Sequence, residues 1–177
     1  DDEKELGDPT ETALKQWYRR ERPDLDAFLS AHPKVFELPF DSDRKLMSVL
    51  VELDGKMQMF TKGAVDVMSA RITQVEEQGQ VRPVTPRDLE QIAAQNQAYS
   101  EQGLRVLCFG YREVQGDTLT LEDETGFTFL GLVAMMDPPR PESKQAVADC
   151  IRAGIKPVMI TGDHVTTASA IASQIGI

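Results

Sequence analysis

The chain has 177 residues, with 19 lysines and arginines against 29 aspartates and glutamates, so its formal net charge at pH 7 is -10. That length suits one compact domain, or one domain plus a piece of another. Hydrophobic residues make up 41% and charged residues 27%, proportions that argue against wholesale disorder and against a coiled coil. The acidic balance argues against a nucleic-acid-binding surface, because neutralising phosphates requires clustered lysine and arginine.

The cysteines and the apolar runs favour a reducing, cytosolic setting. Cys108 and Cys150 both lie in apolar stretches, and no CxxC or Cys/His cluster suggests a metal site or a disulfide framework. The most apolar run, residues 127–136, has about half of the ~20 residues that a membrane-spanning helix needs. The sequence has no initiator methionine and stops at Ile177 just after a helical pattern, so we expect a piece of a longer protein.

The beginning of the chain has the signals of two helices. Asp8 as N-cap, Pro9 at the first helical position and Glu11 in a capping box predict a helix over residues 8–22. A second, shorter helix is predicted over residues 24–32, where a proline follows.

The pattern then changes to that of antiparallel strands. The turn signal Asp54-Gly55 lies between residues 46–51 and residues 56–62, and the second run alternates in side-chain character. This combination predicts a β-hairpin.

The middle of the chain continues this mixture. A cap-plus-proline signal at residues 85–88 opens a helix that should end at Gly103. Residues 105–111 and 128–136 are typical of buried strands, and an acidic loop over residues 113–125 separates them. We therefore predict an α+β fold with a mainly antiparallel sheet flanked by helices.

Three prolines within residues 137–141 form a stiff connector, where we expect a domain boundary. Beyond it, a helix over residues 142–153, a buried strand over residues 155–160 and a helix over residues 166–174 follow in turn. That order is the unit of a parallel, doubly wound α/β sheet, of which one unit alone cannot complete a sheet.

The loop after the predicted strand is the first candidate site. Thr161, Gly162 and Asp163 supply a hydroxyl, an unhindered backbone amide and a carboxylate just before a helix N-terminus, where phosphoryl oxygens bind well. Asp163 or a nearby threonine could equally cap the last helix. To act on phosphate the carboxylate needs a magnesium ion, a water or a proton.

The second candidate site is scattered along the chain. An aromatic ring can stack on a base, ammonium groups neutralise phosphates, a glycine admits a flat ring, and a carboxylate accepts from an exocyclic amine. The residues concerned are Glu11, Phe40, Lys45, Lys62, Gly63 and Arg105. Each has a structural alternative: Phe40 as a core residue, Lys62 as a solvated strand end, Glu11 as half of a capping box and Arg105 as an edge charge. The two histidines lie far apart, so metal binding through them is not expected.

Five strings occurring in family order resemble P-type cation-transporting ATPases, closest to the calcium-pump and sodium-pump branch and its bacterial members. They are G-D-P-T-E-T-A-L at residues 7–14, F-D-S-D-R-K-L-M-S-V at 40–49, F-T-K-G-A at 60–64, D-P-P-R-P-E at 137–142 and the M-I-T-G-D-H motif with its following helix at 159–177. The resemblance covers nearly the whole chain.

This resemblance implies that residues 1–136 are an N-terminally truncated nucleotide-binding domain and residues 137–177 the connector and first part of a phosphorylation domain, which is haloacid-dehalogenase-like. In such pumps Glu11 would bond the adenine amine, Phe40 would stack on the adenine and Gly63 would permit its close approach. Lys45 and Lys62 would line the nucleotide cleft.

The remaining implied contacts concern the sugar, the phosphates and magnesium. Arg105 would reach the phosphates and Leu107 would pack beneath the ribose. Thr161, Gly162 and Asp163 would meet the transferred phosphoryl group and its Mg²⁺.

The sequence also departs from the family pattern. The calcium-pump pattern often has an arginine two residues after the stacking phenylalanine; here that residue is Ser42, and Arg44 or Lys45 could compensate. The usual K-G-A-P-E string ends in Val65-Asp66. The phosphorylated aspartate of the D-K-T-G-T motif, the G-D-G-x-N-D motif, the actuator domain and the membrane helices are not in this sequence.

The resemblance thus predicts an ATP-binding cytoplasmic domain of an integral membrane pump, in a bacterial plasma membrane. It would deliver ATP for aspartyl phosphorylation that drives cation transport, calcium by family. Its partners would be ATP and the phosphorylation, actuator and transmembrane domains of the same pump, with no nucleic acid, and the chain alone could not turn over. The alternatives are a soluble phosphatase of the haloacid dehalogenase superfamily, which would need a nucleophilic D-x-D pair after an upstream strand, and an interaction module using the acidic loop.

Overall fold

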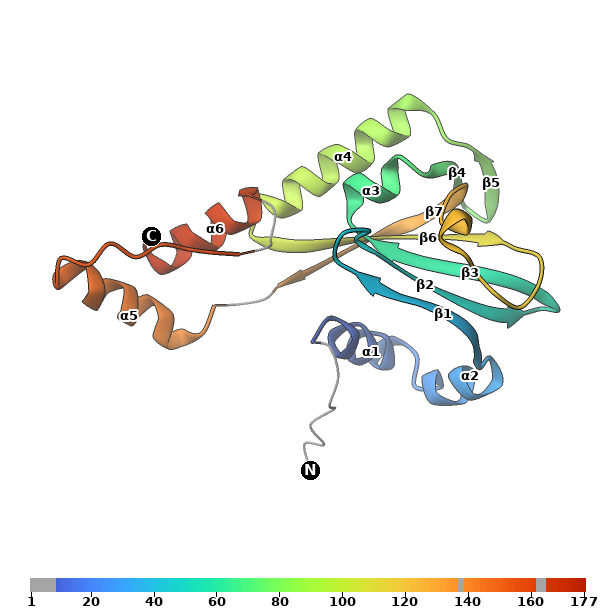
Figure 1. Ribbon diagram of the computed structural model, residues 1–177, viewed down its shortest axis with the longest axis horizontal. Coiled ribbons are helices and arrows are strands. Elements are labelled where there is room, and N and C mark those ends of the chain that lie inside the picture. Colours follow the sequence, from blue (N-terminus) through green and yellow to red (C-terminus); the bar gives the residue numbers. More distant parts are fainter. Residues whose placement is uncertain (1–8, 137–138, 162–164) are drawn as a thin grey trace.

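The computed structural model describes residues 9–136, 139–161 and 165–177, which form an α+β fold (Figure 1). No helix in these ranges has both the length and the apolar character that crossing a bilayer requires. The elements, in chain order, are α1 (Pro9–Glu21), α2 (Leu25–Ala31), β1 (Lys34–Asp41), β2 (Leu46–Leu53), β3 (Lys56–Gly63), α3 (Val65–Ser69), β4 (Ile72–Glu77), β5 (Gln80–Pro83), α4 (Pro86–Ser100), β6 (Leu104–Glu113), the 3₁₀ helix η1 (Leu121–Asp123), β7 (Phe127–Met136), α5 (Pro141–Arg152) and α6 (Val165–Ile175).

The strands form one seven-stranded sheet in the order β1-β2-β3-β6-β7-β4-β5. Five neighbouring pairs run antiparallel, whereas β4 and β7 run parallel, so the sheet is mixed. The sequence did not predict β1 or β5, which are the two edge strands. Each contains a proline, Pro39 and Pro83, and a sheet tolerates proline at its edges or at bulges.

The predicted hairpin is confirmed as β2 and β3. Asp54 and Gly55 both have positive φ angles, 53° and 74°, as the two central residues of a type I′ turn require. The strands pair without a register shift from Leu46–Gly63 at one end to Leu53–Lys56 at the other.

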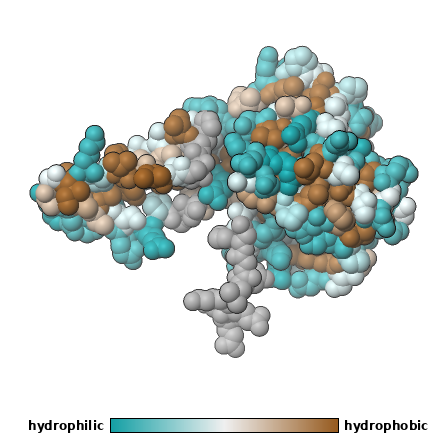
Figure 2. Space-filling view, viewed as in Figure 1, coloured by the Kyte–Doolittle hydropathy of each residue, from teal (hydrophilic) through white to brown (hydrophobic). Residues whose placement is uncertain are grey.

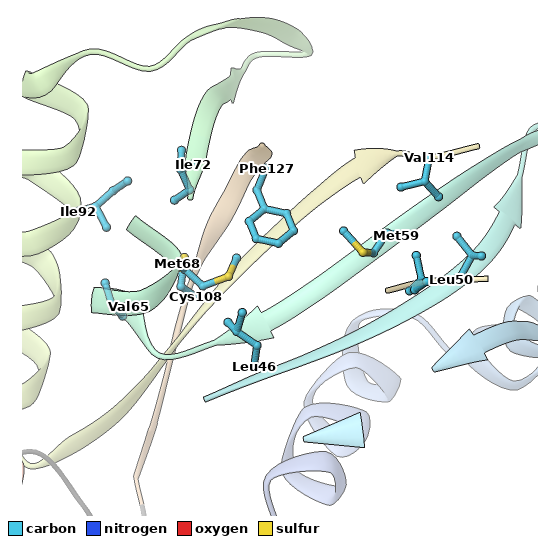
Figure 3. Close-up of a cluster of buried hydrophobic side chains, with 11 residues drawn as sticks. Leu46, Leu50, Met59, Val65, Met68, Ile72, Ile92, Cys108, Val114 and Phe127 are labelled. Carbon is cyan, nitrogen blue, oxygen red and sulfur yellow. The ribbon is translucent and has the colours of Figure 1, made fainter. Parts of the chain in front are cut away.

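One face of the sheet carries the hydrophobic core (Figure 3). Alternate residues of β2, β3 and β6 point to this face and cluster there with side chains from α3, α4 and β7. Burial there raises the pKa of the Cys108 thiol to about 12, because the thiolate would lose its hydration. The largest fully buried apolar side chains are Phe127, Leu46, Leu50, Met59 and Met68.

The helices lie on both sides of this sheet: α3 and α4 on the core face, α1 and α2 on the opposite face (Figure 1). As predicted, α4 begins with Thr85 as N-cap, in a reciprocal capping box with Asp88, and with proline at the first helical position. It ends before Gly103, whose φ of +76° is a left-handed conformation that glycine adopts without strain.

The C-terminal segment contains the two predicted helices, α5 and α6, but the strand predicted over residues 155–160 is wrong. Residues 155–161 form neither helix nor strand. A strand needs hydrogen-bonded neighbours, and no strand in the described part of the chain lies beside this segment. Figure 2 shows hydrophobic side chains gathered on the surface of the C-terminal segment that contains α5 and α6. The large exposed ones are Ile151, Ile155, Val158, Ile160 and Val165.

Candidate functional site

The sheet face opposite the core holds a hollow of about 200 Å³ beside α1. It arises because the strands alternate: while Leu46, Ser48 and Leu50 are buried on the core face, the residues between them face α1. The hollow is mostly apolar with charged groups at one side. Its lining residues are Glu11 and Leu14 from α1, Met47 and Val49 from β2, Phe60, Thr61 and Lys62 from β3, and Phe109 from β6.

The charged groups of the hollow belong to Glu11 and Lys62, which the sequence analysis assigned to the same candidate site. Lys62 Nζ donates a hydrogen bond to Glu11 Oε1, although the residues lie 51 positions apart in the sequence. The Lys62 side chain is only 18% exposed, so its ammonium is held near the apolar wall rather than in bulk water. The interpretation of Lys62 as a solvated strand end is therefore wrong.

The strand register gathers further candidate residues at one end of the sheet. Leu46 pairs with Asp41 on one side and with Gly63 on the other, and Gly63 pairs with Cys108. Because neighbouring strands lie about 4.8 Å apart, this row spans about 14 Å from β1 to β6. The candidate residues in the row or one position away from it are Phe40, Lys45, Lys62, Gly63 and Leu107.

A β-bulge decides the direction of Phe40. Leu38 pairs with Ser48, but Asp41 pairs with Leu46, so β1 has one residue more than β2 in this interval. Without the extra residue Phe40 would pair with Leu46 and point into the core, whereas the bulge turns it toward the face of the hollow. Its side chain is 63% exposed, so the interpretation of Phe40 as a core residue is wrong.

Lys45 and Gly63 lie against each other at the start of β2 and the end of β3. Lys45 is exposed, has a φ of 57°, and forms no ion pair with the residues that the structure describes. Its carbonyl accepts a hydrogen bond of 3.2 Å from the Ala64 amide. A Cβ atom at Gly63 would lie 2.6 Å from the Lys45 carbonyl oxygen and 2.4 Å from Leu46 Cδ2, so glycine is required here for packing of the chain itself.

Arg44 does not replace the arginine that the family pattern has two residues after the phenylalanine. Its side chain is 13% exposed and points into the protein, where Nη1 donates to Glu124 and Nη2 to the Pro39 carbonyl, both at 2.5 Å. Lys45 is the neighbouring cation that remains on the surface.

Apart from Glu11 and Lys62, the candidate residues lie outside the lining of the hollow. Arg105 and Leu107 alternate with the core-facing Cys108 and so share the face of the hollow, Arg105 exposed and Leu107 half-buried. Thr161 is exposed in the coil before α6, while Gly162 and Asp163 lie outside the described residues. The described ranges hold no group of three or more His, Cys, Asp or Glu that could bind a metal ion.

Sequence reasoning missed the apolar wall of the hollow. The signal was present, since alternate residues of a predicted hairpin must face opposite sides. The core could take only one of the two sets, and the other set marks the second face. The missed residues are Leu14, Met47, Val49, Phe60 and Phe109.

A larger hollow, of about 810 Å³, lies between α4 and strands β4, β5 and β7. Its arginine, Arg82, is already bound to Asp88 through two hydrogen bonds and to Glu77 through one. This guanidinium holds the pKa of the Asp88 carboxyl well below its ordinary value. With its arginine so engaged and carboxylates along its edge, this hollow is poorly suited to an anionic ligand.

Comparison with known proteins relates the chain to ion pumps. Residues 1–142 match the family described as the cytoplasmic domain N of P-type ATPases. The chain is 44% identical to a calcium-transporting ATPase of Listeria monocytogenes over 98% of its length, and 44% identical to calcium-transporting ATPase 1 of Lactococcus lactis over 97%. It is 40% identical over 99% of its length to calcium-transporting ATPase 1 of Bacillus cereus. The chain spans about a fifth of the length of these curated relatives.

Proposed function

Because the chain belongs to the P-type ATPase family, we propose that the α1 face of its sheet binds ATP for a cation-transporting pump. The observation that carries this proposal is the register, which brings Phe40 and Lys62 to one end and one side of the sheet, with Lys45 at the same end. An exposed ring beside ammonium groups suits a nucleotide, whose base stacks while its phosphates are neutralised.

In this proposal each residue has a separate task. Phe40 stacks on the adenine, and Glu11 accepts from its exocyclic amine. Lys45 and Lys62 neutralise phosphates, and Lys62 is held in place by its ion pair with Glu11. Arg105, beyond the row of paired residues, extends the cationic edge toward the terminal phosphate.

The proposal extends to the whole pump. Residues 1–136 would be the nucleotide-binding domain, and residues 137–177 the connector and the first part of the phosphorylation domain. The domain carries ATP to an aspartate of its neighbour, so its contribution is positioning and charge neutralisation. The pump would transport calcium, as its relatives are named, across a bacterial plasma membrane with this domain in the cytoplasm. The described residues hold no group of three or more His, Cys, Asp or Glu that could bind Mg²⁺, and Asp163 lies outside them.

A nucleotide titration followed by amide chemical shifts tests the site. We expect weak binding, with a dissociation constant at the high micromolar to millimolar level. This corresponds to a favourable binding free energy of about 4 to 6 kcal/mol. Glu11, Phe40, Lys62 and Arg105 should respond together. Shifts confined to residues after 138 would contradict the proposal.

Replacing Phe40 tests the central contact of the proposed ATP site, the stacking of its ring on the adenine. Phe40→Ala should weaken ATP binding by about 1 to 3 kcal/mol, the usual contribution of one base–aromatic stack. Phe28→Ala is the matched control, since this ring is also exposed, at 43%, but lies on α2 beside His32. Equal affinity of the Phe40 variant and the wild-type protein, with both folded, would remove Phe40 from the site.

A further inference from the structure

The acidic loop between β6 and β7 ends in a carboxylate that is fully buried. The Glu124 side chain is 0% exposed and follows η1, just before β7. Its Oε1 accepts hydrogen bonds from Arg44 Nη1 at 2.5 Å and from Ser48 Oγ at 2.6 Å. Its Oε2 has no hydrogen-bond partner among the described residues. Burying a carboxylate costs free energy unless it is paired, so the presence of Glu124 at this buried position calls for a structural or functional reason.

Arg44 connects this buried carboxylate to the bulge in β1. One nitrogen of its guanidinium donates to Glu124, and the other donates to the Pro39 carbonyl at 2.5 Å. A planar guanidinium can hold two acceptors in fixed directions, which an ammonium group cannot do. Pro39 immediately precedes Phe40, so this contact fixes the backbone from which the Phe40 ring extends.

The loop that carries Glu124 is itself held by two further arginines. Arg71 Nη1 donates to the Glu124 carbonyl at 3.1 Å. Arg112 Nη1 donates to the carbonyls of Asp123 at 3.1 Å and Thr125 at 3.0 Å. Glu124 is therefore a rigid anchor, and Arg44 transmits its position across the edge of the sheet.

We propose that Glu124 is a positioning residue for nucleotide binding: through Arg44 it holds the β1 bulge in the shape that presents Phe40 to the base. This inference rests on the function proposed above. A bulge leaves ladder groups unpaired and its residues less constrained, so without an anchor the ring would sample several directions. Binding ATP would then have to order the Phe40 ring, and the entropy lost in doing so would reduce the affinity for ATP.

A double-mutant cycle on ATP affinity tests this inference. Glu124→Gln keeps the shape of the side chain but removes its charge, and we expect it to weaken ATP binding about 3- to 10-fold. In a Phe40→Ala background the same change should have no effect, because the ring that it positions is gone. Inorganic tripolyphosphate, which has no base, should bind the wild-type and Glu124→Gln proteins equally.

Two further variants separate positioning from stability. Ser48→Ala removes the other hydrogen bond to Glu124 Oε1 but leaves the Arg44 bridge, so ATP affinity should stay at the wild-type value. If Glu124→Gln does not fold, Arg44→Lys takes its place in the cycle, because it keeps a positive charge beside Glu124 without the planar fork.

Each outcome of the cycle supports or overturns the inference. An equal loss in both backgrounds, a loss of tripolyphosphate binding, or no loss in the wild-type background would overturn it. If Phe40→Ala weakens ATP binding and Glu124→Gln does not, the positioning role alone fails. If the wild-type protein does not bind ATP, the proposed function fails as well.

Discussion

The two faces of the sheet are built from the same strands, but they differ in how deeply their side chains are buried and in the charges that they carry. On the core face, β2 buries Leu46, Ser48 and Leu50 completely, and Ser48 donates a hydrogen bond to Glu124 from the loop between β6 and β7. On the other face, Met47 and Val49 of the same strand remain half-buried beside α1 and line a hollow with the Glu11–Lys62 pair.

A single position of register therefore separates the side chains that face the core from those that face the hollow. Alternate residues of one strand can change independently, provided that the strand keeps its register. Two contacts do connect the faces: Gly63, where strand backbones approach closely, and the Glu124–Arg44 bridge. Variants at these contacts should affect stability and ligand binding together.

Two phenylalanines on neighbouring strands provide the largest expected difference between the faces. Phe127→Ala should lower the free energy of unfolding by about 3–5 kcal/mol, because this ring is fully buried and its loss leaves a cavity. Phe109→Ala, on the face of the hollow, should cost about 1–2 kcal/mol, since its ring is only half-buried. Urea unfolding followed by circular dichroism measures both. Equal losses would break the distinction between a closed and an open face.

The predictable parts of this fold are those with local signals. The cap-plus-proline start at Thr85 and the Asp54-Gly55 turn depend on a few adjacent residues, and both occur as predicted. The bulge at Phe40 depends on how many residues the opposite strand contributes, so no local pattern could reveal it. Glu124 lies in the stretch that the sequence predicted as an acidic loop, and its ion pair inside the protein is with an arginine 80 positions away.

The candidate site follows the same division. Composition suggested which residue types suit a nucleotide, and the resemblance proposed which residues would be used. Their convergence depends on the pairing of four strands, which lies beyond local pattern. The strand predicted over residues 155–160 failed for the complementary reason: its apolar residues have the right character, but strand formation needs partners.

Gly63→Ala tests the closest contact between the two faces. The added Cβ would lie 2.6 Å from a backbone oxygen, so the β1–β2 turn must shift, and we expect a loss of about 1–3 kcal/mol in unfolding free energy. ATP affinity should fall as well, because Lys45 moves with this turn. Gly131→Ala is the control: its Cβ meets nothing within 4 Å, and alanine suits a strand better than glycine. Wild-type stability of the Gly63 variant would show that the turn adapts freely.

The smallest expected effect is the pH dependence of the free energy of unfolding that Asp88 causes. Asp88 lies in the larger hollow, beside α4, and not on the face that α1 covers. Hydrogen bonds from Arg82, and then from Thr85, lower the pKa of Asp88 in the folded protein. The ionised carboxylate therefore stabilises the fold fully above the ordinary aspartate pKa, about 3.9, and this contribution is lost as the pH falls through the lower, folded-state pKa.

Asp88→Asn should accordingly be less stable than the wild-type protein at pH 7, and the difference should shrink as the pH falls below about 4. Asp117→Asn is the control and should keep the wild-type stability at pH 7, since Asp117 is exposed and forms no hydrogen bond or ion pair with the residues that the structure describes. Urea unfolding at a series of pH values measures both variants. ATP affinity at pH 7 should be unchanged by Asp88→Asn, because the carboxylate lies in the hollow beside α4, away from the face that α1 covers. A constant difference in stability at every pH would mean that the charge of Asp88 contributes nothing and that only its capping geometry matters.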